Sequence, residues 1–537
     1  LFPNLLWAQS KNGLKSITNE MIDSAARLAG LSFSQIDREE MVLGINANLA
    51  SYKALRKIRI DQNTPPPIYF NPAVPGQKFS KKRKPFIQSK RMSVSRPSNL
   101  EEIAFWPITD LSQLIESRQV SSEELTQMYL KRIKQHDSKL NSVITLTEKL
   151  AIKQARKMDC EIKVGNYRSS LHGIPWGAKD VIAKSGYRTT WGAKAYRNQM
   201  IDYDATLVSR LEEAGAVLIA KLSTGEIARG DRWFDKQTRN PWKINEGSGG
   251  SSAGPGSATA AGFVGFSIGS DTTGSILGPS RTCGISGLRP TFGRISRHGV
   301  MPVCWSLDKV GPMCRSVEDC AIVFQSIHGP DNQDLSLVDM PFNWNGNKNL
   351  KELRIGYIEE AFNENTHPND METLECLRRM GAELQPIRLP KHAGMDALQM
   401  LLVDEAAAFD ELIQTGKVDL FLQDRTEPED MLMRIARLMP AVEYLQIQRL
   451  RMLMMQGMER ALRNIDVYIA PHEGNTNTTT TALTGHPGIS VPNGFDKNGK
   501  PTGILFVGKL YDEANLMIAA KTYQDANNFH LVYPGLD

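Results

Sequence analysis

Two clusters of glycine, serine and threonine lie close together in the middle of this chain and supply side chains for nucleophilic chemistry. They occupy residues 247–257 and 270–276, and a strand-like apolar run at 261–268 separates them. Glycine permits backbone conformations closed to other residues and lets a backbone approach a ligand closely. We expect two turns with one strand between them. The N–H groups bunched in such turns form a nest for an anion, either a phosphate or an oxyanion.

The two kinds of nest make different demands on the sequence. A phosphate-binding loop places a lysine and then a serine or threonine directly after its glycines, and no lysine follows these glycines. Nucleophilic catalysis requires a serine in the nest and a base, which can lie far away in the sequence. The choice between these uses therefore depends on finding a base elsewhere in the chain.

The base that a serine nucleophile needs is not an obvious histidine. The chain has nine histidines, but none lies in a Gly-x-Ser-x-Gly turn or another recognisable triad context. A neutral lysine is the known alternative, provided that burial lowers its pKa. Lys179 follows the apolar, glycine-bearing stretch 172–178, as expected for a segment buried in a sheet. The residues alone leave open a second interpretation, in which Lys179 forms a salt bridge with Asp180.

Several motifs, taken in order, resemble those of the amidase signature family. The segment LHGIPWGAKD at 171–180 is similar to the lysine motif of that family. The segments GGSS at 249–252, GSDTTGS at 269–275 and CGISGLRPTFGR at 283–294 follow in the expected order. The similarity covers roughly residues 101 to 537, and it implies one large mixed, twisted sheet surrounded by helices.

The resemblance also implies catalytic roles for three side chains. Ser275 matches the nucleophile, Ser251 matches a bridging serine that follows an unusual cis peptide, and Lys179 matches the general base. The implied reaction is hydrolysis of a carboxylic amide through an acyl-serine intermediate, with no cofactor and no metal. The implied oxyanion hole consists of the backbone N–H groups of Thr272, Thr273, Gly274 and Ser275.

Some positions near the implied nucleophile depart from the family pattern. The usual Ser-Ser-Gly-Gly is replaced by SSAG at 251–254, and Pro255 follows. The usual arginine after Gly-Ser-Ile is replaced by Leu277, and the lead into Cys283 is PSRT at 279–282. Because the three catalytic side chains remain, we still expect activity, whereas the shape of the pocket and the substrate stay open.

The remaining pattern predicts an α/β domain with a sheet covered on both faces. Strand-like and helix-like segments alternate, as in domains whose helices cover a sheet. The strand-like runs are 216–222, 262–268, 353–358, 467–470, 488–491 and 502–507, and the helix-like runs are 110–115, 121–133, 147–158, 205–214, 317–327, 393–416, 428–463 and 512–526. The methionines of 428–463 fit either a core or an adaptable apolar pocket.

The first hundred residues predict a small helical extension and a linker. Residues 18–60 indicate two short helices, with Thr18 and Ser34 as candidate caps. The pair, followed by the prolines at 65–67, resembles the small third subunit of tRNA-dependent amidotransferases, although an oligomerisation arm explains it equally well. The basic residues of 76–99 suit RNA or an anionic membrane, but no interleaved aromatic stacking platform accompanies them, which favours a solvated linker. We expect an extension at 1–75, a basic linker at 76–100 and a catalytic domain at 101–537.

Composition limits the cofactors, partners and location that we expect. With 41% hydrophobic and 23% charged residues, the 537-residue chain has an ordinary globular composition. No apolar run reaches the ~20 residues of a membrane span, and a formal charge of +5 does not by itself predict nucleic-acid binding. The opening residues LFPNLLWAQ resemble the end of an export signal, or else a trimmed chain start that packs on the core. The cysteines favour buried free thiols over disulfides or a metal site, and they are Cys160, Cys283, Cys304, Cys314, Cys320 and Cys376.

Three functions remain open on the sequence. The first is a stand-alone amidohydrolase acting on a small-molecule amide, with a homodimer as one possible assembly. The second is the glutaminase subunit of a tRNA-dependent amidotransferase, with its tRNA-binding partner on a separate chain. The third is a catalytically silent binding protein on the same scaffold, which the retention of Lys179, Ser251 and Ser275 argues against.

Overall fold

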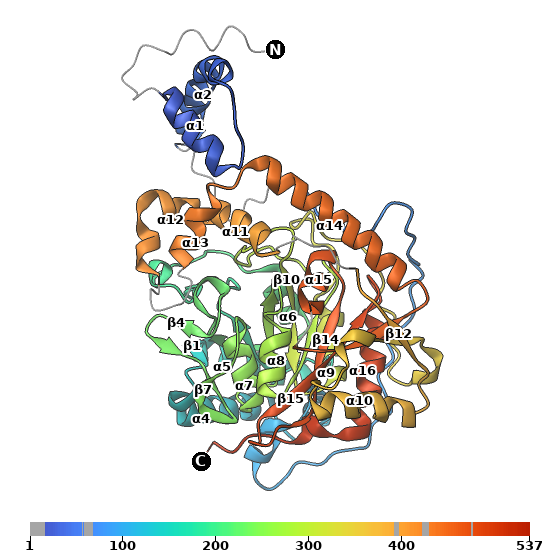
Figure 1. Ribbon diagram of the computed structural model, residues 1–537. Coiled ribbons are helices and arrows are strands. Elements are labelled where there is room, and N and C mark those ends of the chain that lie inside the picture. The colour runs from blue at the N-terminus through green and yellow to red at the C-terminus, as the bar shows by residue number, and fades with distance from the viewer. Residues whose placement is uncertain are drawn as a thin grey trace.

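An 11-stranded mixed sheet runs through the centre of the molecule, with helices around it (Figure 1). The structure is a computed structural model that describes residues 17–55, 57, 68–390, 397–421, 429–473 and 476–536. The strand order is β1-β3-β2-β8-β10-β9-β14-β15-β13-β11-β12. The strands are β1 (Val143–Leu146), β2 (Pro175–Lys179), β3 (Val217–Leu222), β8 (Phe266–Asp271), β9 (Ser286–Arg289), β10 (Lys309–Cys314), β11 (Ile355–Ile358), β12 (Leu384–Ile387), β13 (Val467–Pro471), β14 (Gly488–Phe495) and β15 (Pro501–Gly508). The predicted fold class, a large mixed sheet surrounded by helices, is confirmed.

The sheet combines parallel and antiparallel pairs. Strand β2 runs parallel to both β3 and β8, and β11 runs parallel to both β12 and β13. The other neighbouring strands are antiparallel. Because β2 and β8 are parallel neighbours, their carboxyl ends lie at the same edge of the sheet. Two separate two-stranded pairs accompany it, namely β4 (Arg232–Trp233) with β5 (Lys236–Gln237) and β6 (Arg239–Asn240) with β7 (Lys243–Gly247).

Helices bury the hydrophobic faces of this sheet. Helix α16 packs on β14 and β15, α9 packs on β9 and β10, and α5 packs on β3. Their bounds are α3 (Ile108–Glu116), α4 (Ser122–Leu140), α5 (Glu148–Lys163), α6 (Thr206–Glu213), α7 (Ala253–Ala260), α8 (Leu277–Cys283), α9 (Val317–Ile327), α10 (Pro368–Arg379), α11 (Ala397–Ala408), α12 (Asp410–Thr415), α13 (Glu429–Ala436), α14 (Ala441–Ala461), α15 (Asn477–Thr484) and α16 (Glu513–Asn527). The predicted helix at 121–133 begins as expected, because Ser121 and Glu124 form a complete capping box.

One sequence prediction around the first serine cluster is wrong. Residues Ala253–Ala260 form helix α7 instead of part of a turn, and the following strand begins only at Phe266. Pro255 is tolerated because it lies in the first helical turn, where its missing N–H has no intrahelical acceptor. The small residues of α7 allow close packing. A Cβ on Gly254, for example, would lie 2.3 Å from the backbone nitrogen of Ser223. A helix and a strand, rather than one strand, therefore separate the two clusters.

The methionines of 428–463 mostly belong to the core. Met433 and Met458 are fully buried, and Met454 and Met455 are nearly so. Met452 is partly exposed, and Met431 lies among the residues whose side chains are not described. The interpretation of these methionines as core residues therefore holds for the four buried ones.

The N-terminal helices form a hairpin that lies apart from the sheet domain (Figure 1). Helix α1 (Asn19–Leu28) is capped by Thr18, whose side chain accepts a hydrogen bond from the Met21 N–H, and α2 spans Gln35–Leu55. Asp23 of α1 pairs with Arg38 of α2 at 3.2 Å. The signal-like residues 1–9 and the prolines at 65–67 lie outside the described residues.

Residues 68–99, here named the N-terminal strap, run in an extended path along the surface of the sheet domain. The Phe70 ring lies edge-on to Phe292 at 5.1 Å, and the guanidinium carbon of Arg451 lies 3.4 Å from its centroid. Further along, the Ser89 N–H donates to Glu318 at 2.7 Å. The strap is therefore attached to the domain at both ends of its path, although its lysines Lys81, Lys82 and Lys84 stay exposed.

Five of the six cysteines are buried free thiols, as predicted, and Cys160 is an exposed one. Within the described residues, no helix combines the length and the apolar character that crossing a membrane requires.

Replacing Phe70 by alanine should lower the free energy of unfolding by about 1–3 kcal/mol, because it removes a ring packed against Phe292 and Arg451. Chemical denaturation of the purified protein measures this change. Tyr69→Ala is the matched control, since Tyr69 is 47% exposed and its removal should cost less than about 0.5 kcal/mol. Equal losses for the two variants would contradict a specific anchor at Phe70.

Candidate active site

The carboxyl end of β2 carries the predicted base, Lys179, into the interior of the protein. All five residues of β2 are buried between β3 and β8, and Lys179 is completely inaccessible. The Nζ atom of Lys179 lies 2.8 Å from Ser251 Oγ and 2.9 Å from Ser270 Oγ. The structure thus brings the predicted base and the predicted bridging serine into direct hydrogen-bond contact.

Burial changes the acidity of this amine. It lowers the pKa of Lys179 to about 7, while the carboxylates of Asp271 and Asp308 act in the opposite direction. A charged ammonium is costly without water around it, so the neutral form becomes accessible near neutral pH. Lys179 can therefore accept a proton, which an exposed lysine cannot do under the same conditions.

Asp180 does not pair with Lys179. Its carboxylate lies 2.6 Å from Lys221 Nζ, and it accepts hydrogen bonds from the N–H and the hydroxyl of Thr190. Consecutive side chains at a strand end point to opposite faces of the sheet, which keeps the two neighbours apart. The salt-bridge interpretation of Lys179 is therefore wrong, and its amine remains available to the serines.

The first serine cluster holds Ser251 against the second. The peptide between Gly250 and Ser251 is cis, as the family resemblance led us to expect. Gly250 must be a glycine, because a Cβ there would lie 1.9 Å from the carbonyl oxygen of Gly230. Next in the chain, the N–H of Ser252 donates to the carbonyl of Ser275 at 3.1 Å. This bond joins the backbone that carries Ser251 to the backbone that carries Ser275.

The turn that carries Ser275 is organised around the Asp271 carboxylate. Asp271 accepts hydrogen bonds from the N–H groups of Gly274 and Ile276, both at 2.8 Å. Arg289 lies 3.6 Å from the same carboxylate, and both side chains are fully buried. Gly274 has a φ of 136°, a conformation that favours glycine. Ser275 itself is half-buried at the end of this turn.

Two residues of this site were not identified from the sequence. Ser270 provides a second hydroxyl to Lys179, and Asp271 shapes the turn that carries Ser275. Serine and aspartate can both take part in such chemistry, but their place in the motif GSDTTGS was the only signal, and it did not distinguish them from the other residues of the motif. At one departure from the family pattern, Leu277 is almost completely buried at the start of α8.

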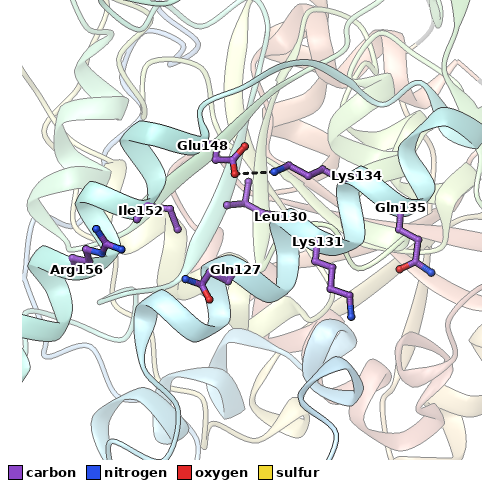
Figure 2. A pocket seen from close by; sticks show the side chains of 8 residues that line it. All are labelled: Gln127, Leu130, Lys131, Lys134, Gln135, Glu148, Ile152 and Arg156. Atoms are coloured by element: carbon purple, nitrogen blue, oxygen red, sulfur yellow. Dashed lines mark hydrogen bonds and ion pairs between the residues drawn. The ribbon is translucent and has the colours of Figure 1, made fainter.

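Two cavities offer room for a ligand. One lies beside this turn, and the other lies on the surface away from it. The first cavity is lined by Ser270 and Thr272 and so adjoins Lys179 and the turn that carries Ser275. The other is a surface groove between α4 and α5, where Leu130 and Ile152 lie beside the ion pair Lys134–Glu148 (Figure 2). The lining of the groove contains no serine, threonine or cysteine, so the first cavity is the one connected with the predicted chemistry.

Comparison with known proteins identifies the family. The family model described as Amidase matches residues 124–482. The A subunit of glutamyl-tRNA(Gln) amidotransferase from Bacillus licheniformis is 34% identical over 480 residues, which cover 80% of this chain and 99% of that protein. Its counterpart from Acinetobacter baumannii is 33% identical over 476 residues, covering 79% and 96%. The chain belongs to the amidase signature family, as the motifs led us to expect.

Solved structures agree with this assignment. The native peptide amidase from Stenotrophomonas maltophilia has a TM-score of 0.72 and 30% identity, covering 80% of this chain and 98% of that one. An amidase family protein from Bacillus anthracis has the same TM-score at 28% identity, covering 80% and 92%. The protein is therefore an enzyme that cleaves carboxylic amides.

Lys221→Met should lower the free energy of unfolding by about 3–5 kcal/mol, because it leaves the carboxylate of Asp180 buried without its cation. Arg388→Met is the control, because the Arg388–Glu359 pair is largely exposed and should contribute less than about 1 kcal/mol. Both values come from chemical denaturation. A loss at Lys221 no larger than at Arg388 would contradict a structural role for the buried pair.

Proposed function

We propose that Lys179, Ser251 and Ser275 form the catalytic triad of an amidohydrolase that works through an acyl-serine intermediate. The observation that carries this proposal is the contact of 2.8 Å between the buried Lys179 amine and Ser251 Oγ. Neutral Lys179 takes a proton from Ser251, and Ser251 takes the proton of Ser275 as Ser275 Oγ attacks the amide carbonyl. The relay then returns a proton to the departing amine, and water hydrolyses the acyl-enzyme.

The oxyanion of the tetrahedral intermediate would be held by backbone N–H groups of the nucleophile turn. The candidates are those of Thr272, Thr273, Gly274 and Ser275. The N–H of Gly274 donates to Asp271 Oδ1, so the other three are the better placed donors. Loss of one such donor typically costs about 10²–10³ in rate.

We propose that residues 101–537 form the catalytic domain, that 76–100 are a basic linker fixed to its surface, and that 1–75 are a helical extension. The extension is an interaction element in this proposal, because its hairpin lies apart from the sheet domain and exposes Leu28 and Ile36. A homodimer is one assembly that it would serve.

A second candidate function is the glutaminase subunit of a tRNA-dependent amidotransferase. Its support is the similarity to the A subunit of glutamyl-tRNA(Gln) amidotransferase, which extends over nearly all of that protein. Ammonia would then pass to a partner rather than leave as a product. Glutamine turnover that appears only with a co-purified partner chain would favour this function, whereas amide hydrolysis by the isolated chain favours the first.

A serine-directed fluorophosphonate should add once to the wild-type protein, and intact mass spectrometry would detect the adduct. Ser275→Ala should abolish the adduct, because it removes the nucleophile. Lys179→Ala should slow its formation by at least about 100-fold, since general-base catalysis contributes about 10²–10⁴. Lys134→Ala, on the surface groove, is the control and should react like the wild type. A persistent adduct in Ser275→Ala would overturn the assignment of the nucleophile.

The labelling rate should rise with pH between about 5 and 9, with a midpoint near the Lys179 pKa of about 7. At a pH below this pKa, Lys179 is protonated and cannot accept the proton of Ser251. At a higher pH, Lys179 is neutral and can accept it. Stopped labelling reactions at constant ionic strength give this profile, and Lys179→Ala should lose the rise. A wild-type rate that is flat or falls between pH 6 and 8 would contradict Lys179 as the base.

A further inference from the structure

The cavity beside the nucleophile turn has mostly apolar walls. Besides Ser270 and Thr272, its lining includes Val300, Met301, Pro302, Val303 and Val310. Ser270 is the serine whose hydroxyl lies 2.9 Å from Lys179 Nζ, so the cavity adjoins the proposed proton relay. A substituent of a substrate bound at Ser275 can therefore extend into it.

Most charged groups that line this cavity are already paired inside the protein. Asp308 accepts hydrogen bonds from Thr272 Oγ1 and from the N–H groups of Val303 and Cys304, at 2.7–2.8 Å. Arg297 pairs with Asp334 at 3.0 Å and donates to Ser336 and to the carbonyl of Trp305. His298 lies 3.3 Å from the Thr206 hydroxyl. These groups have little capacity left for a ligand.

Lys309 is the exception. It stands on β10 opposite Asp271, it is 3% exposed, and it lines the cavity. Within the described chain its ammonium has one acceptor, the carbonyl of Thr272 at 3.2 Å. An ammonium carries three N–H donors, so two lack a protein partner there. Burial, followed by the charge of Arg289, lowers the pKa of Lys309 to about 7, against the opposing effect of Asp271 and Asp308.

We propose that Lys309 binds a carboxylate of the substrate, so that the enzyme prefers amides bearing a carboxylate on the part that enters this cavity. The inference rests on the proposed function of Ser275 and names its substrate class. A carboxylate would accept the two remaining donors, and the apolar walls would hold the hydrocarbon spacer between carboxylate and amide. A neutral analogue would leave two N–H donors of the buried ammonium without a charged partner, which is how a polar site rejects a substrate lacking the matching group.

The experiment compares each carboxylate-bearing amide with its methyl ester on wild type and variants. One series carries the carboxylate on the acyl part, as dicarboxylic acid mono-para-nitroanilides. The other carries it on the amine part, as N-acyl aminobenzoates. In at least one series, wild-type kcat/KM should favour the carboxylate by about 10- to 100-fold, as for a hydrogen bond between charged groups. Lys309→Met should abolish this preference, mainly through KM, and leave the ester within about twofold.

Fluorophosphonate labelling separates this role from a structural one. Lys309→Met and the polar variant Lys309→Gln should both label at Ser275 at the wild-type rate. If Lys309 only supports the turn through the Thr272 carbonyl, labelling and turnover of all substrates would fall together, and the inference would be overturned. Normal labelling of the wild type without any preference for a carboxylate would overturn the inference alone. Absence of wild-type labelling would overturn the proposed function as well.

Discussion

The site depends on keeping one lysine amine away from water and away from any carboxylate partner. Lys179 is fully buried at the end of β2, and its contacts are the hydroxyls of Ser251 and Ser270. The adjacent carboxylate of Asp180 would hold the amine in its charged form, but Lys221 and Thr190 engage that carboxylate on the other side of the strand. The desolvation that makes Lys179 a usable base is therefore a property of the sheet around it.

The sheet also determines how the two serine clusters meet. Because β2 and β8 run parallel as neighbours, the end of β2 delivers Lys179 to the same edge at which β8 delivers Ser270 and the Asp271 turn. Helix α7 fills the space between the clusters with small residues, and all of its residues are buried. Close packing of the main chain and of small side chains therefore holds the hydroxyl groups of the two clusters together. Hydroxyl groups by themselves attract one another only weakly.

The segments before the sheet domain are held in place in a different way. The N-terminal strap has almost no regular hydrogen bonding of its own, so single anchors such as Phe70 and Ser89 fix its path. The helical hairpin before it is stabilised by contacts between its own two helices, such as the Asp23–Arg38 pair. This hairpin lies apart from the sheet domain (Figure 1).

The sequence by itself determined the chemistry and the kind of fold. The motifs around Lys179, Ser251 and Ser275 identified the family, and local patterns predicted six of the eleven strands of the sheet and the capped helix at Ser121, because periodicity and capping depend on near neighbours. They did not predict β9 and β10 at the centre of the sheet. Only the tertiary structure decided the partner of Asp180, the helix at Ala253–Ala260, the place of Ser270 beside Lys179 and the burial of Lys309. Each of these depends on contacts between segments far apart in the chain, and burial, which sets the pKa of both lysines, exists only once those segments have packed.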